Sequence, residues 1–305
     1  MENRPNADRV GWVGLGVMGM PMARNLVRAG YAVSGWARRS DTAERAAAEG
    51  IVMHASSAEL ARASDVMITM VTTSEDVIGL CLGEGGLVES AARGAALVDM
   101  STVAPSVSRR LAEVAAGFGI GFLDAPVSGG SFGAEQGTLT IMAGGDAGLV
   151  ERCRPLFEVM GDPDRIFHTG PVGSGETVKL VNNMLVGSIS AATLEALLVG
   201  VGADVPLETL VDVIGVSSGA SAQLSGQLVT RAFAGKLDPG FATDLLVKDL
   251  RLAAEVARQV GQETPLTDVA LRLFEASQQA GNGARDYTAL AVEMSKEASQ
   301  RLRLE

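Results

Sequence analysis

One lysine of this sequence lies among amide and apolar residues, in a stretch whose spacing is typical of a helix. The stretch 170–183 reads G-P-V-G-S-G-E-T-V-K-L-V-N-N. Residues three and four positions apart share a helix face, so Lys179 is expected beside Asn182 and Asn183. A lysine ammonium in a closed site can donate a proton and stabilise charge on oxygen, as hydride transfer to a carbonyl requires. The alternative is a solvated lysine on an amphipathic helix.

A hydroxyl group with two glycines forms a second candidate site. Ser128, Gly129 and Gly130 follow an expected strand end and offer an O–H together with unobstructed backbone N–H groups. Such a turn suits a substrate carboxylate or a developing alkoxide. A plain connection between strand and loop is the alternative.

A glycine-rich turn near the N-terminus has the spacing G-x-G-x-x-G, with Gly14, Gly16 and Gly19 between an expected strand and helix. Gly14 permits the tight turn, Gly16 lets a pyrophosphate approach the backbone, and Gly19 allows close packing of helix on strand. The expected cofactor contacts here are Gly14, Leu15, Gly16, Val17, Met18 and Gly19. A turn without a ligand is the alternative.

The residues after the second expected strand indicate which dinucleotide binds. An NAD site usually has an acidic residue there, whereas this chain has Arg38, Arg39 and Ser40. The two arginines and the hydroxyl can bind a 2′-phosphate, so NADP(H) is favoured over NAD(H). The alternative is a solvated loop, with Asp41 and Glu44 forming a capping box for the next helix.

The elements that must position these residues follow two patterns. Up to about Gly170, short β-rich runs alternate with helical patterns, which is typical of a parallel sheet covered by helices on both faces. The expected strands are Val10–Leu15, Ala32–Trp36, Val66–Val71, Ala96–Met100, Gly121–Ala125 and Leu139–Ala143.

Beyond Gly173, helical periodicity dominates. The expected helices are Thr177–Gly200, Leu207–Val216, Thr243–Val260 and Leu266–Gln279. We therefore predict an α/β protein with an N-terminal Rossmann-type parallel-sheet domain over residues 1–172. A long helix would join it to an all-α C-terminal domain over residues 173–305.

Composition narrows the classes of partner and site. A net charge of -11 disfavours binding to nucleic acid or to an acidic membrane surface. Cys81 and Cys153 are expected to be reduced structural thiols, and no Cys/His spacing indicates a metal site. His54 and His168 have no partner at motif spacing, so a histidine mechanism is disfavoured. The polar start lacks a secretory signal and no apolar run reaches membrane-spanning length, so we expect a cytoplasmic protein.

Four segments in order and spacing make the chain resemble the β-hydroxyacid dehydrogenase family, over nearly its full length. They are the glycine turn, D-A-P-V-S-G-G at 124–130, the lysine stretch, and K-D-L-R-L-A at 248–253. The resemblance implies that Lys179 is the catalytic lysine, that Asn183 orients it or the substrate, and that the active site lies in a cleft between the domains. It also implies a homodimer or homotetramer.

Further contacts follow from the same resemblance. The loops after the strands that end near Val71 and Met100 would bind cofactor through Val71, Thr72 and Thr102, although helix capping is the alternative for the threonines. Lys248 would contact the cofactor and Phe241 the substrate, and without the resemblance Phe241 would be interpreted as core packing.

The chain departs from the family pattern at two places. The cofactor turn has Ala37-Arg38 where the family often has Asn-Arg, and the loop after the fourth-strand methionine has Val71-Thr72 where it often has Leu-Pro. An imine reductase shares this architecture but generally lacks the lysine. A non-catalytic NADP(H)-binding module would not need Lys179, Ser128 and Asn183, and 6-phosphogluconate dehydrogenase has a larger helical domain.

We predict an NAD(P)-dependent oxidoreductase that transfers a hydride between the cofactor and a small β-hydroxyacid, semialdehyde or 2-oxo acid. Candidate substrates are 3-hydroxyisobutyrate, tartronate semialdehyde, glyoxylate and succinic semialdehyde. The arginine-rich turn favours NADPH-dependent reduction of an aldehyde as the physiological direction.

Overall fold

A nine-stranded sheet forms the centre of the first of two structural units, in a computed structural model that describes residues 8–295. The first unit runs to Lys179 and the second begins at Leu180. The strands are β1 (Val10–Val13), β2 (Val33–Trp36), β3 (Val52–Met53), β4 (Val66–Thr69), β5 (Ala96–Asp99), β6 (Gly121–Asp124), β7 (Val127–Ser128), β8 (Leu139–Gly145) and β9 (Gly161–Gly170).

The strand order is β3-β2-β1-β4-β5-β6-β8-β7, with β9 pairing β8. Strands β1 to β6 are all parallel, whereas β8 runs antiparallel to β6 and β7. The order reverses between β1 and β4, which is the switch point where doubly wound sheets bind ligands. The Rossmann-type sheet expected from the sequence is therefore confirmed.

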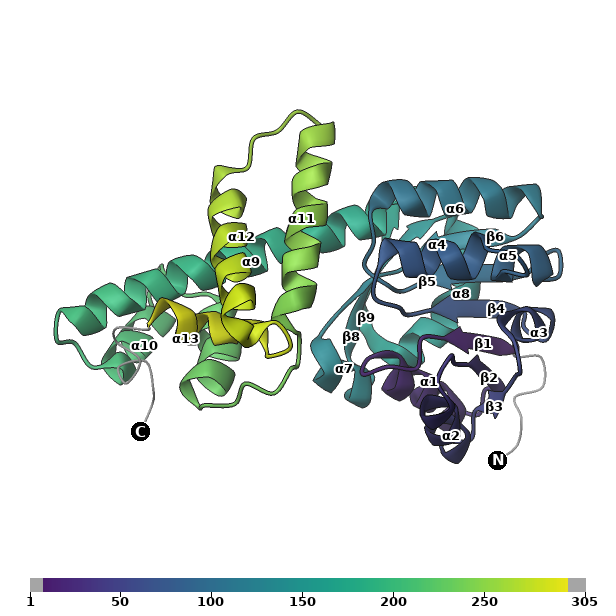
Figure 1. The fold of residues 1–305 in the computed structure, drawn as a ribbon, viewed down its shortest axis with the longest axis horizontal. Helices are drawn as coiled ribbons and strands as arrows, with labels where there is room; N and C mark the ends of the chain where they lie inside the picture. Colours follow the sequence, from purple (N-terminus) through teal and green to yellow (C-terminus); the bar gives the residue numbers. More distant parts are fainter. Residues whose placement is uncertain (1–7, 296–305) are drawn as a thin grey trace. The chain divides into compact units, whose positions relative to one another are not determined.

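Helices cover both faces of this sheet (Figure 1). They are α1 (Gly19–Arg28), α2 (Ser40–Ala48), α3 (Ser57–Arg62), α4 (Ser74–Leu82), α5 (Leu87–Ser90), α6 (Pro105–Gly117), α7 (Gly130–Gln136) and α8 (Ala147–Met160). In β4, Val66 and Ile68 enter the core that contains α1 and α8, while Met67 enters the core beneath α4 and α6. Because alternate side chains of β4 are buried on opposite faces, its sequence begins with a continuous apolar run, V-M-I.

Three strands have no counterpart in the sequence prediction. The strands β3 and β7 are two residues each, too short for a periodic signal. The sequence of β9, G-D-P-D-R-I-F-H-T-G, is mostly exposed along an edge and has the composition of a loop. The predicted capping box is wrong: α2 begins at Ser40 after Arg39, and Asp41 instead accepts a hydrogen bond from its neighbour's N–H.

The second unit is helical, and its described part has no strand beyond an isolated bridge between Ala242 and Asp286. It holds most of α9 (Ser174–Gly202), then α10 (Leu207–Gly215), the π-helical segment η1 (Gln223–Phe233), α11 (Thr243–Gln259), α12 (Pro265–Ser277), η2 (Gln278–Asn282), the 3₁₀ turn η3 (Tyr287–Ala289) and α13 (Leu290–Met294). Its core includes Leu194, Leu197, Leu246, Leu250 and Phe274.

Helix α9 is 29 residues long and belongs partly to each unit. By length and composition alone it could cross a membrane, so the expectation that no apolar run reaches that length is wrong. Its Leu194 and Leu197 nevertheless pack in the core of the helical unit. A single such helix is weak support for a membrane span, and we interpret α9 as a helix of the fold.

Candidate dinucleotide and substrate site

The carboxyl ends of four parallel strands meet in one row across the sheet. Val13, Thr69, Asp99 and Asp124 are consecutive register partners on β1, β4, β5 and β6. Each strand ends at this row, so the loops that follow leave from the same edge. These loops contain most of the residues that the sequence predicts for the first unit, and this edge is where doubly wound folds bind nucleotides.

The glycine turn lies between β1 and α1 at the switch point. Gly14 has φ of +95°, and a Cβ on it would collide with the carbonyl oxygen of Met70. A Cβ on Gly19 would collide with the carbonyl oxygen of Gly14, whereas a Cβ on Gly16 would meet nothing within 4 Å. Gly16 and Val17 are exposed while Leu15 is buried. The open space over Gly16 and the N-terminus of α1 fit a pyrophosphate.

The loop after β2 presents Arg38, Arg39 and Ser40 to solvent. Arg39 makes two hydrogen bonds of 3.0 and 2.6 Å with Asp41, and this bonding lowers the pKa of the Asp41 carboxyl. Arg38 has a looser partner, with its Nη2 atom 3.7 Å from a carboxylate oxygen of Asp76 in α4. Of the two arginines, Arg38 is therefore the one whose guanidinium is less firmly held.

The loops after β4 and β5 are joined to each other. The backbone N–H of Val71 donates to the Ser101 hydroxyl at 2.9 Å, and Ser101 N–H donates to Asp99. Asp99 is fully buried and also accepts from the Thr69 hydroxyl at 2.8 Å. Thr102 is half-buried beside this network, and Thr72 is exposed. The structure thus brings the two predicted cofactor loops together.

The turn formed by Ser128, Gly129 and Gly130 comes after β6, at the end of the short strand β7. Ser128 ends β7 and is half-buried; Gly129, with φ of +135°, precedes α7; and Gly130, with φ of +62°, begins it. A side chain on Gly129 would be strained at that φ and would approach Leu139. The turn therefore leaves its backbone exposed next to the Ser128 hydroxyl.

Lys179 is buried, with 8% of its surface exposed, and lies in the second turn of α9. Asn183 follows one turn later on the same helix face. The Asn183 side-chain amide donates to Asp249 at 2.7 Å, and the Asn182 side-chain amide donates to the Asn183 side-chain oxygen Oδ1 at 3.1 Å. The Asn183 side chain is therefore held in place by hydrogen bonds at both ends of its amide group, one of them from Asn182.

Asp249 is a site residue that the sequence prediction missed. It is buried in α11, and its second oxygen lies 2.9 Å from the Lys248 ammonium. One carboxylate thus holds both Asn183 and Lys248, two residues predicted separately. The sequence signal was the acidic neighbour in K-D-L, but nothing in the spacing indicated that it would reach α9.

Phe241 is half-buried and has a well-defined position in the helical unit. Its N–H donates to Asp286 at 3.1 Å, its carbonyl accepts from Tyr287, and its ring meets the Tyr287 ring edge-on at 6.0 Å. Burial raises the pKa of the Tyr287 hydroxyl, which donates to Gln223. This environment accounts for the position of Phe241 by packing and hydrogen bonds alone.

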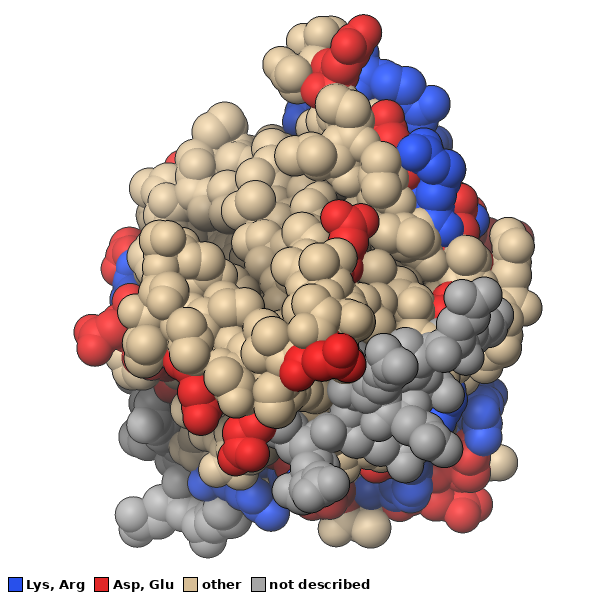
Figure 2. All heavy atoms as spheres, turned by 90° about the vertical axis from the view of Figure 1, so that its left-hand side faces the viewer, with Lys and Arg blue, Asp and Glu red and all other residues tan. Residues whose placement is uncertain are grey.

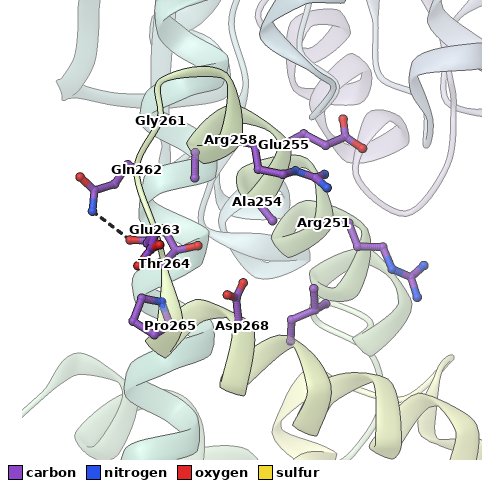
Figure 3. Close-up of a pocket in the computed structure, with 12 residues that line it drawn as sticks. Arg251, Ala254, Glu255, Arg258, Gly261, Gln262, Glu263, Thr264, Pro265 and Asp268 are labelled. Atoms are coloured by element: carbon purple, nitrogen blue, oxygen red, sulfur yellow. Dashed lines mark hydrogen bonds between the residues drawn. The ribbon is translucent and has the colours of Figure 1, made fainter.

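A pocket of the helical unit holds none of the predicted residues. It lies between the end of α11 and the start of α12, lined by Arg251, Arg258, Glu263 and Asp268 among others (Figure 3). Within residues 8–295, no group of three or more His, Cys, Asp or Glu side chains is placed to hold a metal. Both cysteines are buried and free.

A glycine turn at the switch point of a parallel sheet, with a buried lysine on a later helix, is typical of NAD(P)-dependent oxidoreductases. Comparison with known proteins identifies the family of the chain more specifically. Residues 9–170 match the NAD binding domain of 6-phosphogluconate dehydrogenase. Residues 173–293 match the family described as NAD-binding of NADP-dependent 3-hydroxyisobutyrate dehydrogenase.

Individual relatives agree over nearly full length. A 2-(hydroxymethyl)glutarate dehydrogenase from Eubacterium barkeri is 38% identical, over 92% of this chain and 93% of its own. An NAD-dependent L-serine dehydrogenase from Pseudomonas aeruginosa is 36% identical, over 92% and 95%. The structure of Mycobacterium tuberculosis 3-hydroxyisobutyrate dehydrogenase with L-serine has a TM-score of 0.87 and 32% identity, covering 94% of this chain and 99% of its own. The chain belongs to the β-hydroxyacid dehydrogenase family and is an NAD(P)-dependent oxidoreductase acting on CH–OH groups.

Proposed function

We propose that this enzyme interconverts a small carboxylic acid bearing a hydroxymethyl group and the corresponding semialdehyde, with Lys179 as general acid and base. The observation that carries the proposal is the buried Lys179 one helical turn from Asn183, whose amide is fixed by Asp249. A buried ammonium beside a held amide is suited to a reacting oxygen, because both groups can bond to it as charge develops.

The relatives support the substrate class. 2-(Hydroxymethyl)glutarate, L-serine and 3-hydroxyisobutyrate all carry a hydroxymethyl group on the carbon next to a carboxylate. They differ only in the third substituent of that carbon. We infer that Ser128, with the N–H groups of Gly129 and Gly130, binds the shared carboxylate, and that Phe241 contacts the variable substituent.

The side chains of the protein must transfer a proton and stabilise charge on the reacting oxygen. A bound nicotinamide accepts or supplies the hydride. In the oxidative direction, the Lys179 amine would accept the alcohol O–H proton as the substrate becomes an aldehyde. In the reductive direction the Lys179 ammonium returns the proton to the oxygen, and Asn183 holds that oxygen in line.

For the cofactor, we propose NADP(H) in preference to NAD(H), with NADPH-dependent reduction as the physiological direction. The loop after β2 has no carboxylate at residues 37–40, and Arg38 is the guanidinium less firmly held by a neighbour. A 2′-phosphate would replace the weak Asp76 contact with charge-assisted hydrogen bonds.

We also propose a homodimer or homotetramer assembled through the helical unit. The face at the α10 end of that unit is mostly uncharged (Figure 2). Val199, Val213 and Val216 are exposed on α9, on α10 and just beyond it. Large exposed apolar residues favour a surface that binds another chain.

The test is turnover of a substrate panel by wild type, Lys179→Ala and Lys179→Arg, with Lys236→Ala as the control for an exposed lysine. We expect NADPH-dependent reduction of a semialdehyde acid, and a loss of at least about 10³-fold in kcat for Lys179→Ala, because the proton donor is gone. Arginine keeps the charge but does not release a proton, so Lys179→Arg should remain impaired. Cofactor binding should stay within about threefold of wild type in both.

Two outcomes would contradict the proposal. Lys179→Ala activity within about tenfold of wild type would remove the lysine from the chemistry. Turnover confined to cyclic imines would move the enzyme to the imine reductase class, and cofactor binding without any turnover would indicate a non-catalytic module.

A further inference from the structure

The first turn of α9 is fastened to the sheet by its backbone. Asp124, at the end of β6, accepts from the N–H of Gly173 at 2.7 Å and from the N–H of Glu176 at 3.0 Å. A Cβ on Gly175 would collide with the carbonyl oxygen of Met142 in β8 and lie 2.8 Å from the carbonyl oxygen of Asp124. The turn therefore lies directly against two strands, and the glycine of the motif is what permits this approach.

From this turn, one buried side chain reaches a different loop. Glu176 has no exposed surface, and its Oε2 atom accepts from the backbone N–H of Val103 at 3.2 Å. Val103 lies in the loop after β5, more than seventy residues earlier in the chain. Burying a carboxylate is costly unless hydrogen bonds compensate for lost water, so this contact holds the loop in one position.

The two residues of this contact lie near groups with different roles in the proposed reaction, the proton donor and the cofactor loops. Lys179 follows Glu176 by three residues and lies on the same side of α9. Thr102, predicted to contact the cofactor, is the residue before Val103, and Ser101 in the same loop holds the N–H of Val71. A displacement at Glu176 would thus shift the proton donor relative to both cofactor loops.

We infer that Glu176 is a positioning residue for hydride transfer, which sets the place of Lys179 relative to the loop that carries Thr102. The inference rests on the proposed function, because it assumes that Lys179 acts on the reacting oxygen. Reaction rates depend steeply on such placement, and an error of about 1 Å can lower the rate on the order of 10²-fold.

A residue needed only for folding would behave differently. Its loss would lower thermal stability and the amount of active enzyme, while molecules that remain folded would react at the normal rate. A positioning residue instead lowers kcat in folded protein, leaves cofactor affinity nearly unchanged, and makes hydride transfer more strongly rate-limiting.

The experiment compares Glu176→Ala, Glu176→Asp and Glu176→Gln with Glu195→Ala, which removes an exposed carboxylate of the same helix. Gln keeps the chain length and an acceptor oxygen, whereas Ala has no acceptor and Asp is one methylene shorter. The measurements are kcat, cofactor Kd, the primary isotope effect with C4-deuterated NADPH, and hydrogen–deuterium exchange of the Val103 amide without cofactor.

We expect Glu176→Ala and Glu176→Asp to lose about 10- to 100-fold in kcat, with Kd within about threefold and a larger isotope effect than wild type. Their Val103 amide should exchange at least about tenfold faster. Glu176→Gln and Glu195→Ala should stay close to wild type in all four measurements. If Glu176→Ala does not fold, the Asp and Gln pair carries the same comparison.

Unchanged Val103 exchange in Glu176→Ala would overturn the inference without reference to catalysis. So would faster exchange accompanied by wild-type kcat and isotope effect, since the contact would then be structural only. Failure of the proposed function gives a different pattern, in which Lys179→Ala retains turnover or wild type has none.

Discussion

At the scale of single residues, Arg38 and Arg39 are neighbours in the chain but meet different carboxylates. The paired hydrogen bonds with Asp41 must break before Arg39 can bind a phosphate, whereas the 3.7 Å contact of Arg38 with Asp76 involves less loss. The two arginines should therefore contribute unequally to cofactor selection, although both are exposed.

We predict that Arg38→Ala raises the Kd for NADPH by about 10- to 100-fold and leaves the Kd for NADH within about twofold. A charge-assisted bond to the 2′-phosphate of this kind contributes about 1.5–3 kcal/mol. Arg39→Ala should change the ratio of the two Kd values less than Arg38→Ala does. Fluorescence titration of both cofactors measures this, and equal effects of the two substitutions would refute the ranking.

Asp124 leads to a prediction about pH. Burial raises the pKa of this carboxyl from 3.8 to about 6, against the opposing effect of its backbone hydrogen bonds. Between these values the folded protein binds a proton that the unfolded chain has released. The contribution of Asp124 to stability is therefore complete below about pH 3.8 and is lost as pH rises through about 6.

We predict that Asp124→Asn removes this fall in stability between pH 4 and 6, measured as Tm across that range. The substitution should also lower Tm by a few degrees overall, because the N–H group of either Gly173 or Glu176 loses its acceptor. Asp65→Asn is the control: the Arg9 hydrogen bond lowers the Asp65 pKa to about 2, so its contribution is lost only at more acidic pH. An unchanged slope in Asp124→Asn would contradict the assignment.

At the scale of elements, two glycines of the turn between β1 and α1 have different roles, although they belong to the same sequence motif. Gly19 is required by packing, since its Cβ would meet the Gly14 carbonyl, while Gly16 faces open space. Removing either glycine should impair the enzyme, but for different reasons.

We predict that Gly16→Ala keeps Tm within about 2 °C of wild type while weakening NADPH binding by at least tenfold, because the added methyl occupies the space expected for the pyrophosphate. Gly19→Ala should lower Tm by several degrees, because α1 must move away from the sheet. Calorimetry with and without cofactor tests both. Cofactor affinity unchanged in Gly16→Ala would argue against a pyrophosphate at this turn.

The elements also show how far sequence reasoning reaches. Strands β1, β2, β4, β5, β6 and β8 and the four helices expected beyond Gly173 follow from apolar runs and helical periodicity, and their ends differ from the structure by a few residues. Strand β9 could not be predicted, since it pairs along one edge and buries few side chains. The segment η1 lies over 223–233, where Ser225 and Gly226 interrupt the helical signal.

Some residues of the candidate site can likewise be predicted from the sequence, and others cannot. Gly14, Gly16 and Ser128 belong to local motifs, whose spacing identifies them. Asp124 and Glu176 bind backbone N–H groups, which every residue has, and Asp249 binds an amide 66 positions away. No pattern of residue types predicts such partners, so the roles of these carboxylates can be recognised only in the folded structure.

At the scale of the whole molecule, each unit has its own hydrophobic core, and the helical unit also exposes apolar residues. We predict that light scattering gives a mass of about two or four times the 31.4 kDa of one chain. The double variant Val213→Lys with Val216→Lys should raise the dissociation constant of the assembly by at least tenfold, because a buried charge opposes association. Val52→Lys, on the exposed edge of the sheet unit, should not. A monomeric wild type would refute the assembly.

Helix α9 belongs partly to each unit, and this limits how the chain can change by insertion and deletion. A connection through an irregular linker would tolerate added residues, but each residue added to a helix rotates everything after it by about 100°. One residue gained or lost between Lys179 and Asn183 would take the asparagine off the lysine's face, and Asp249, which is bonded to Asn183, would turn with it. The two halves of this protein are therefore not interchangeable modules: a recombinant that joins halves of two relatives would work only if the junction in α9 preserves the count of residues.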